Sequence, residues 1–114
     1  MNIEDFRSYC LSKPFVNESF PFDETTLVFK VAGKMFAVTD LNEPFAITLK
    51  CDPEKALVLR EHYPAILPAW HFNKKHWIRL EIDGSLTDEM IKELIDHSFS
   101  LVVKSLPQKI RKQF

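Results

Sequence analysis

Two runs of strand-forming residues stand only two residues apart in the first third of the chain. The first run is Thr26–Val31 and the second covers residues 34–39, and both are rich in β-branched and aromatic side chains. The two residues between them are Ala32 and Gly33. A connection this short requires the flanking strands to run antiparallel and to pair as a hairpin. The chain is therefore predicted to fold around an antiparallel sheet.

The strand predicted over residues 76–82 is the most informative, because polar and apolar side chains alternate cleanly along it. Its isoleucines and leucine must face the core, so Trp77, Arg79 and Glu81 face the opposite way. The strand predicted over residues 45–50 alternates in the same manner and directs Thr48 and Lys50 outward. A short aromatic edge strand is expected within residues 15–22. The outer face of the sheet is therefore predicted to combine a tryptophan with cations.

Two helices are predicted from their start signals. Asn2 is an N-cap with Asp5 three residues on, which is a weak form of the capping box. Asp52 followed by Pro53 is a stronger signal, with an N-cap and a proline at the first helical position. The buried stripe of this second helix is predicted to be Ala56, Leu59 and Tyr63.

A long third helix is predicted to begin at Ser85 or Thr87 and to end before Pro107. Its apolar residues recur at helical spacing, as Ile91, Leu94, Ile95, Ser98, Leu101 and Val102. With helices near both chain ends and strands between them, the predicted fold class is α+β. The N- and C-terminal helices pack on one face of the antiparallel sheet in a two-layer sandwich.

The chain of 114 residues is long enough for one domain with a real core. We assign residues 1–106 to this domain and predict that the basic tail, residues 107–114, is frayed. The absence of an apolar run of membrane-spanning length and of a signal-peptide pattern predicts a cytoplasmic protein. The two cysteines, Cys10 and Cys51, lie in apolar patterns and are predicted to be small buried hydrophobic residues.

Charge is distributed unevenly along the chain. The net charge is −1 and the sequence pI is about 6.4, which argues against a protein that grips duplex nucleic acid through a uniformly basic surface. Residues 1–43 nevertheless carry seven acids against four bases, whereas residues 104–114 carry four bases and no acid. A protein with one basic flank is therefore consistent with the sequence.

Residues 68–79 combine both tryptophans with two of the four histidines and three of the fifteen Lys and Arg residues. Exposed aromatic rings beside cations are the groups that stack a nucleic-acid base and hold a phosphate. The candidate nucleic-acid-binding or ligand-binding residues are Lys50, Trp70, His71, Asn73, Lys74, Lys75, His76, Trp77, Arg79 and Lys104. The alternative is that the loop over residues 64–75 covers Trp77, with Trp70 and Phe72 as packing partners.

Two kinds of partner fit these residues. The first is DNA or another nucleic acid, with the Lys34 hairpin as a wing and residues 104–112 as an auxiliary basic flank. The second is a small anionic ligand or a protein, bound in a pocket built from the same residues.

No catalytic constellation is recognisable in the sequence. It offers no catalytic carboxylate pair, no Ser/His/Asp arrangement and no phosphate-binding glycine loop. His71 and His76 are five residues apart, a spacing that places them on one face of neither a helix nor a strand, and no third ligand is spaced nearby. We therefore predict no metal, no cofactor and no enzymatic activity.

Four segments of the chain resemble the MmcQ/YjbR family of small bacterial proteins. They are Phe20-Pro21-Phe22 with the hairpin that follows, Leu49-Lys50-Cys51-Asp52-Pro53-Glu54, His71-Phe72-Asn73-Lys74-Lys75-His76-Trp77, and the last helix around Leu94-Ile95-Asp96-His97-Ser98. The resemblance covers nearly the whole chain in the right order. It implies a frataxin-like (CyaY-like) α+β fold and DNA binding through a double-wing use of the hairpins. It implies no catalytic residue, and the acidic ridge of iron-binding frataxins has no counterpart here.

Overall fold

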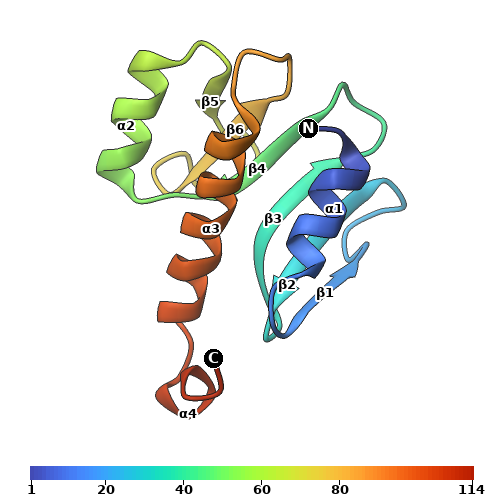
Figure 1. The fold of residues 1–114 in the computed structure, drawn as a ribbon, viewed down its shortest axis with the longest axis vertical. Helices are drawn as coiled ribbons and strands as arrows, with labels where there is room; N and C mark the ends of the chain where they lie inside the picture. The colour runs from blue at the N-terminus through green and yellow to red at the C-terminus, as the bar shows by residue number, and fades with distance from the viewer.

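The computed structural model describes residues 1–114 and contains one six-stranded sheet in the order β1-β2-β3-β4-β6-β5, in which every neighbouring pair is antiparallel. The elements are α1 (Ile3–Leu11), β1 (Val16–Ser19), β2 (Thr26–Val31), β3 (Lys34–Asp40), β4 (Ala46–Lys50), α2 (Pro53–His62), β5 (Ile66–Pro68), β6 (Trp77–Glu81), α3 (Asp88–Lys104) and α4 (Gln108–Arg111). Helices α1 and α3 cover one face of the sheet (Figure 1). The predicted α+β class is confirmed.

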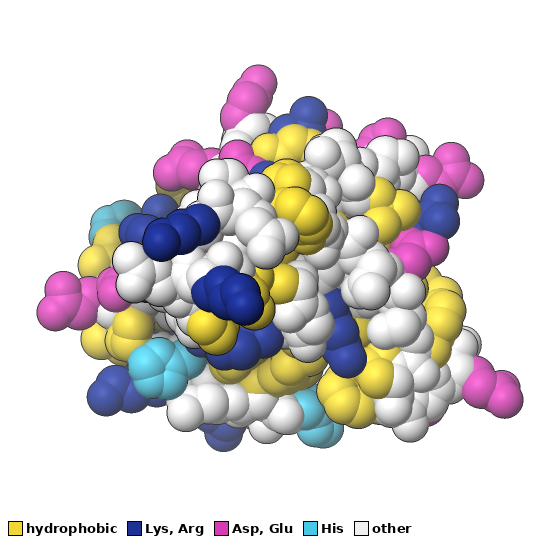
Figure 2. Space-filling view, turned by 90° about the horizontal axis from the view of Figure 1, so that it is seen from below, with side chains coloured by type: hydrophobic (Ala, Val, Ile, Leu, Met, Phe, Trp, Pro, Cys, Tyr) yellow, Lys and Arg dark blue, Asp and Glu magenta, His cyan; other side chains and the backbone are white.

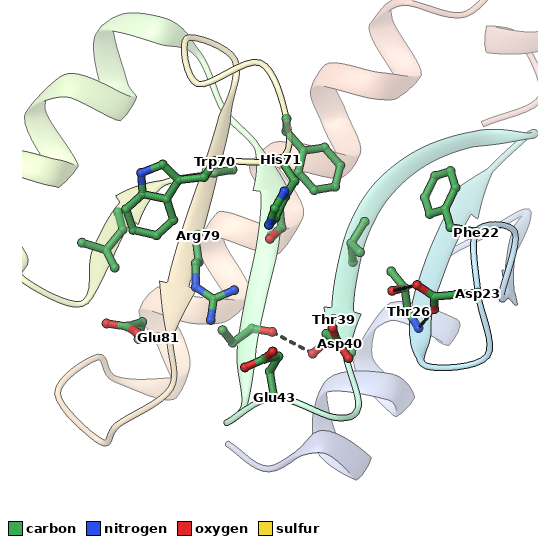
Figure 3. Close-up of a pocket in the computed structure, with 16 residues that line it drawn as sticks. Phe22, Asp23, Thr26, Thr39, Asp40, Glu43, Trp70, His71, Arg79 and Glu81 are labelled. Atoms are coloured by element: carbon green, nitrogen blue, oxygen red, sulfur yellow. Dashed lines mark hydrogen bonds between the residues drawn. The ribbon is translucent and has the colours of Figure 1, made fainter.

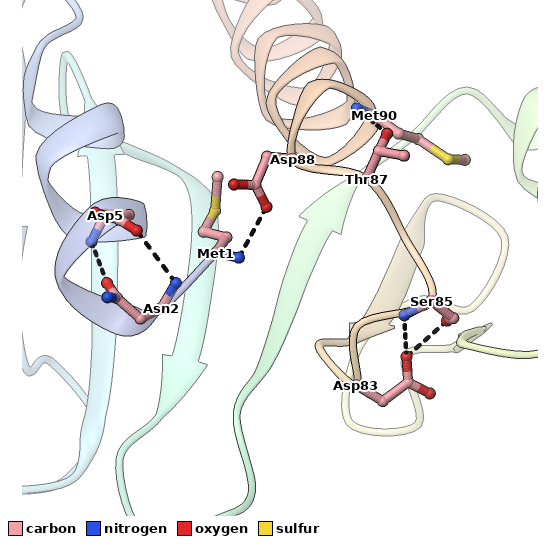
Figure 4. A network of polar contacts seen from close by, with 8 residues as sticks. All are labelled: Met1, Asn2, Asp5, Asp83, Ser85, Thr87, Asp88 and Met90. Carbon is pink, nitrogen blue, oxygen red and sulfur yellow. Dashed lines mark hydrogen bonds and ion pairs between the residues drawn. The ribbon is translucent and has the colours of Figure 1, made fainter.

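The helices begin at the predicted caps. The side chain of Asn2 accepts the amide of Asp5 at 2.8 Å, and that of Asp52 accepts the amide of Lys55 at 3.1 Å. Of the two candidate caps for α3, Thr87 is the one used, and its hydroxyl accepts the amide of Met90 (Figure 4). Ser85 is instead tied to Asp83 within the preceding turn.

The tight hairpin between β2 and β3 forms as predicted. Ala32 and Gly33 have φ angles of 48° and 82°, so both residues of the turn are in the left-handed region. Turns of this kind match the right-handed twist of the flanking strands. The amide of Ala32 donates to the carbonyl of Phe15 at 3.2 Å, which fixes the hairpin tip against the connection between α1 and β1.

The core lies between the sheet and the two covering helices. Phe6 of α1 packs edge-on against Phe29 of β2, with ring centroids 5.2 Å apart. Most of the predicted stripe on α3 is buried, with the exception of the half-buried Leu101. The strand residues that close this layer from the sheet side are Leu27, Phe29, Val31, Phe36, Ala37, Ile47, Leu49, Ile66, Ile78 and Leu80.

The pairing between β3 and β4 at the centre of the sheet is short, and we call this junction the seam. Only two residue pairs register there, Ala37 with Leu49 and Val38 with Thr48. Beyond one end of the seam, the buried hydroxyl of Ser98 donates to the carbonyl of Phe36 at 2.6 Å and accepts the amide of Lys50 at 2.9 Å. Hydroxyl groups bridge both ends of the seam, because Thr39 Oγ1 donates to the carbonyl of Ala46 at 2.7 Å at the other end.

The structure differs from the sequence predictions in three places. Residues 66–68, predicted as loop, form the edge strand β5, because their backbone pairs with β6. Tyr63 is not part of a buried stripe but the exposed C-cap of α2, since the chain turns extended there. The tail, predicted to be frayed, forms the short helix α4, and the ring of Phe114 packs on Phe15 and Phe99.

Both cysteines are buried and free, as predicted. Burial raises the pKa of the Cys10 thiol to about 12 and that of Cys51 to about 11. Neither thiol is therefore poised for nucleophilic chemistry. None of the helices has the combination of length and apolarity required to cross a bilayer.

Replacing Ser98 with alanine is expected to lower the free energy of unfolding by about 2–4 kcal/mol. The substitution leaves the carbonyl of Phe36 and the amide of Lys50 without their partner, and a buried polar group without a hydrogen bond costs roughly 1–3 kcal/mol. Urea denaturation measures the change. The matched control is Ser100→Ala on the exposed side of α3, expected within about 0.5 kcal/mol of the parent. Equal effects for the two substitutions would contradict the bridging role.

His97 links α3 to the start of α2. Its Nε2 accepts the amide of Asp52, the N-cap of α2, at 3.1 Å, which requires the neutral ring. Partial burial lowers the pKa of His97 below 6.5, and the positive charge of Lys55 lowers it further, against an opposing effect of Asp52. The unfolded state therefore takes up this proton more readily than the folded state.

We expect stability to fall as the pH drops below about 6.5, and part of this loss to disappear in His97→Gln. The folded-state pKa of His97 lies below the unfolded value, so the stability it contributes is complete above the unfolded pKa and declines as the pH falls. Urea midpoints between pH 5 and 8 measure the slope. Exposed His62 provides the control, and a His62→Gln variant that flattened the profile equally would contradict the assignment.

Candidate functional site

The face of the sheet opposite the helices carries the residues that the alternation predicted to point outward. Thr48 of β4 is in register with Arg79 of β6, and Lys50 is in register with Trp77. Leu67 of β5 pairs with Arg79 from the other side. Arg79 therefore lies in the middle of three strands, on the face that neither α1 nor α3 covers.

A groove of about 740 Å³ hollows this open face (Figure 3). Its floor is built from β3, β4, β5 and β6. One wall is the segment after β5, and the other comes from the loops that precede β2 and β4. The residues that line it are Phe22, Asp23, Thr26, Val38, Thr39, Asp40, Glu43, Ala46, Thr48, Leu67, Ala69, Trp70, His71, Phe72, Arg79 and Glu81.

Two neighbouring polar side chains on the floor of this groove, those of Arg79 and Thr48, have no partner in the protein. The guanidinium of Arg79 makes no hydrogen bond and no ion pair within the chain. Its register neighbour Thr48 is only 8% exposed as a residue, and the Thr48 hydroxyl also makes no internal hydrogen bond. Every side-chain nitrogen or oxygen that is sealed from solvent has a hydrogen-bond partner in this structure. The Thr48 hydroxyl has no such partner, so it must be open to the groove.

Four carboxylates share the groove with Arg79. Asp23 is occupied locally, because it accepts the amides of Thr25 and Thr26, and these hydrogen bonds hold its pKa below the ordinary value. Asp40 accepts the amide of Asn42. The carboxylates of Glu43 and Glu81 make no hydrogen bond or ion pair and lie below Arg79 in the view of Figure 3.

The aromatic residues of the candidate segment divide between the groove and the packing. Trp70 is 56% exposed and stands at the groove rim with His71 (Figure 3). Trp77 is half-buried and packs against Phe72, with ring centroids 5.2 Å apart. Phe72 is therefore the packing partner of Trp77, whereas Trp70 is not. The ring of Trp77 is accordingly not freely exposed.

Residues 73–76 form an ordered turn rather than part of the groove. Asn73 accepts the amide of Lys75 through its side chain and the amides of His76 and Trp77 through its carbonyl. Lys74 and Lys75 are exposed, and the carbonyl of Lys74 accepts Arg60 of α2. His76 is half-buried, with its carbonyl accepting the amide of Cys51. Of the ten candidate residues, only Trp70, His71 and Arg79 line the groove.

Lys104 belongs to a different surface at the lower end of the molecule. The Nζ of Lys34, at the hairpin tip, lies 3.5 Å from the carbonyl of Ser105, the C-cap of α3. The contact of Phe114 with Phe15 holds the C-terminal segment against the α1–β1 connection. We call the exposed cations gathered there the basic pole: Lys34, Lys104, Lys109, Arg111 and Lys112.

The segments that form the basic pole contain no acidic side chain. None of its five cations takes part in an ion pair, and residues 25–39 and 97–114 contain no carboxylate side chain. Figure 2 looks onto this end of the molecule and shows Lys and Arg side chains across its middle, with Asp and Glu side chains around the edge. A chain of net charge −1 therefore presents a concentrated positive surface.

Sequence reasoning missed the acidic half of the groove. Glu43 precedes β4 and Asp40 ends β3, so both flank the strand connection that borders the floor. Their only sequence signal is that both lie in the connection between two predicted strands. Which loops fold over the open face is not encoded in strand alternation.

Comparisons with known proteins agree with the fold. The family described as YjbR matches residues 11–101. The uncharacterized protein YbdF of Escherichia coli O157:H7 is 37% identical over 96% of this chain and 91% of its own length. The uncharacterized protein YjbR of E. coli K12 is 36% identical over 98% of this chain and 96% of its own.

Two solved structures are also similar. The crystal structure of Deinococcus radiodurans protein DR2400, a DUF419 domain, superposes with a TM-score of 0.93 at 40% identity, covering 98% of this chain and 86% of that one. A Pseudomonas syringae protein gives a TM-score of 0.76 at 31% identity, covering 89% of this chain and 98% of that one. The fold is thus that of a small α+β protein of the YjbR type. This chain belongs to the YjbR family.

Removing the ring of Phe72 is expected to expose Trp77. In a Trp70→Phe background, Trp77 is the single tryptophan, and Phe72→Ala should shift its emission to longer wavelength and increase its quenching by acrylamide. Phe22→Ala in the same background is the control, because Phe22 lines the groove but has no aromatic contact with Trp77. An unchanged spectrum in Phe72→Ala would show that Phe72 does not shield the indole.

Proposed function

We propose that this YjbR-family protein binds nucleic acid through the basic pole. The observation that carries the proposal is the gathering of five exposed, unpaired cations on an end of the molecule with no acid among them. Phosphate contacts by lysine and arginine supply most of the affinity of non-specific nucleic-acid binding. The proposal is consistent with the cytoplasmic location predicted from the sequence.

The geometry suits a backbone contact better than base recognition. The hairpin tip with Lys34 stands beside the C-terminal segment with Lys109 and Arg111, so a wing and a basic flank can meet one phosphate chain together. This is the use of a hairpin that a frataxin-like double-wing protein would make. The aromatic stacking expected of Trp77 has less support, because Phe72 covers its ring.

The overall charge limits the affinity of this surface. The acids lie away from the basic pole, several of them around the groove, so a polyanion is attracted at one end and repelled elsewhere. With up to five phosphates neutralised, the logarithm of the binding constant should fall with the logarithm of salt concentration with a slope no steeper than about −4.5 for duplex DNA.

Reversing charges at the basic pole is expected to abolish DNA binding. In Lys34→Glu/Lys109→Glu/Arg111→Glu, the affinity for a fluorescein-labelled 20-base-pair duplex in 50 mM salt should fall by about a hundredfold or more, since each lost phosphate contact weakens binding. Fluorescence anisotropy measures the affinity, with a single-stranded oligonucleotide of the same length as a second probe.

Two control variants locate the surface. Lys92→Glu makes the same charge reversal as each basic-pole substitution, but near the N-terminal end of α3. It should leave the DNA affinity within about twofold of the parent, because Lys92 lies among Met1, Asp5 and Asp88, away from the basic pole. Lys74→Glu/Lys75→Glu tests the turn before β6, which the sequence favoured. If only the latter variant lost binding, the interface would lie at that turn. If the parent protein bound neither oligonucleotide in 50 mM salt, the proposal would fail.

A second candidate function, binding of a small ligand, is favoured by a separate observation. Arg79 and Thr48 present an unpaired guanidinium and an unpaired hydroxyl on the floor of a concave site. Pockets of about 300–1,000 Å³ with a few convergent polar groups are typical of small-molecule sites. This observation supports the predicted alternative of a small ligand with an anionic group, bound in the groove.

A further inference from the structure

We propose that the groove on the open face binds a small zwitterion that carries a carboxylate, an ammonium group and an apolar body, of the class of aromatic α-amino acids and short peptides. The site differs from the basic pole in position and in charge, so it stands independently of nucleic-acid binding. Its parts lie around Arg79: an anion anchor, an acidic side and an aromatic rim (Figure 3).

The anion anchor is formed by Arg79 and Thr48. Arginine presents a planar fork that matches both oxygens of a carboxylate, and a neighbouring hydroxyl can donate to one of them. Both side chains project from adjacent strands in register, and neither has a partner within the protein. Their backbone positions are fixed by the sheet, so little ordering is required when a carboxylate binds.

The acidic side is formed by Glu43 and Glu81. These two carboxylates make no internal hydrogen bond or ion pair, whereas Asp23 is saturated by Thr25 and Thr26. They lie more than 4.0 Å from the Arg79 nitrogens, because the structure contains no ion pair between them. An ammonium group of the ligand would satisfy them while the carboxylate satisfies Arg79.

The charge of the groove selects against multiply charged anions. One arginine faces four carboxylates among the lining residues, so a nucleotide phosphate with two or more negative charges would meet net repulsion. A molecule with balanced charges avoids this repulsion and uses both halves of the site. This separates the groove from an ordinary phosphate pocket.

The aromatic rim accounts for the apolar body of the ligand. Trp70 is more than half exposed, and Phe22, on the opposite wall, is 64% exposed. Exposed rings on two sides of a concavity can pack against an aromatic or aliphatic side chain and thereby lose their contact with water. Phe72 continues this wall while it packs on Trp77.

Titrating the full-length ¹⁵N-labelled protein with four matched probes tests the proposal by NMR. L-phenylalanine carries both charges, phenethylamine lacks the carboxylate, 3-phenylpropionate lacks the ammonium, and alanyl-phenylalanine separates the charges by one residue. The amide signals of Thr48, Arg79 and Trp70 should shift with L-phenylalanine or the dipeptide. The affinity obtained from these shifts should be at least about tenfold higher than that for either singly charged probe. The tighter of the two zwitterions distinguishes a free amino acid from a short peptide.

Variants assign the two charged ends. Arg79→Gln should weaken binding of the zwitterion about tenfold or more without changing the affinity for phenethylamine. Glu43→Gln/Glu81→Gln should also weaken binding of the zwitterion, but without changing the affinity for 3-phenylpropionate. Thr48→Val provides a second test of the anchor should Arg79→Gln fail to fold. Lys74→Ala/Lys75→Ala, outside the groove, should leave all affinities unchanged.

Three results would overturn the proposal. The first is the absence of groove shifts with both zwitterions at 10 mM. The second is equal affinity for L-phenylalanine and 3-phenylpropionate, which would mean a simple anion site. The third is tighter binding of adenosine monophosphate, added as a phosphate probe, than of either zwitterion. None of these outcomes bears on the basic pole, which the oligonucleotide titrations test separately.

Discussion

The arrangement of this protein depends on the hydroxyl of Ser98. It joins the carbonyl of Phe36 to the amide of Lys50 where the backbones of β3 and β4 no longer pair. The bridge satisfies two buried backbone groups that would otherwise be orphaned, and it comes from the middle of α3. One side chain thus closes the seam of the sheet and positions the longest helix across it.

The same seam shapes the open face. Because β3 and β4 register over only two residue pairs, with Thr39 bridging the far end, the two halves of the sheet separate beyond them (Figure 1). On the face away from α3, the groove is lined by residues of both halves, with Val38 on one side and Arg79 on the other. A continuous ladder between β3 and β4 would leave less room for a concavity there. The structural role of Ser98 and the candidate ligand site are therefore two consequences of one feature.

Charge segregation explains how a chain of net charge −1 can offer two chemically opposite surfaces. The acid-free stretches, residues 25–39 and 97–114, are distant in sequence, but the contact of Lys34 with Ser105 brings them together. Carboxylates from the strand ends meet instead around Arg79. The two proposed ligands, a polyanion and a small zwitterion, would accordingly use different surfaces of the molecule, and average composition describes neither surface.

The sequence by itself determined most of the elements, the hairpin, the helix caps and the side to which Arg79 points, because these follow from spacing over a few residues. Successive side chains of a strand point to opposite faces, for instance, so Arg79 must point away from the core when its neighbours Ile78 and Leu80 are buried. Tertiary structure alone decided that Phe72 covers Trp77, that residues 66–68 add an edge strand, and that Glu43 lines the same groove as Arg79. These contacts depend on how loops cross an existing sheet, and loop paths are set by packing between segments that are distant in sequence rather than by local patterns.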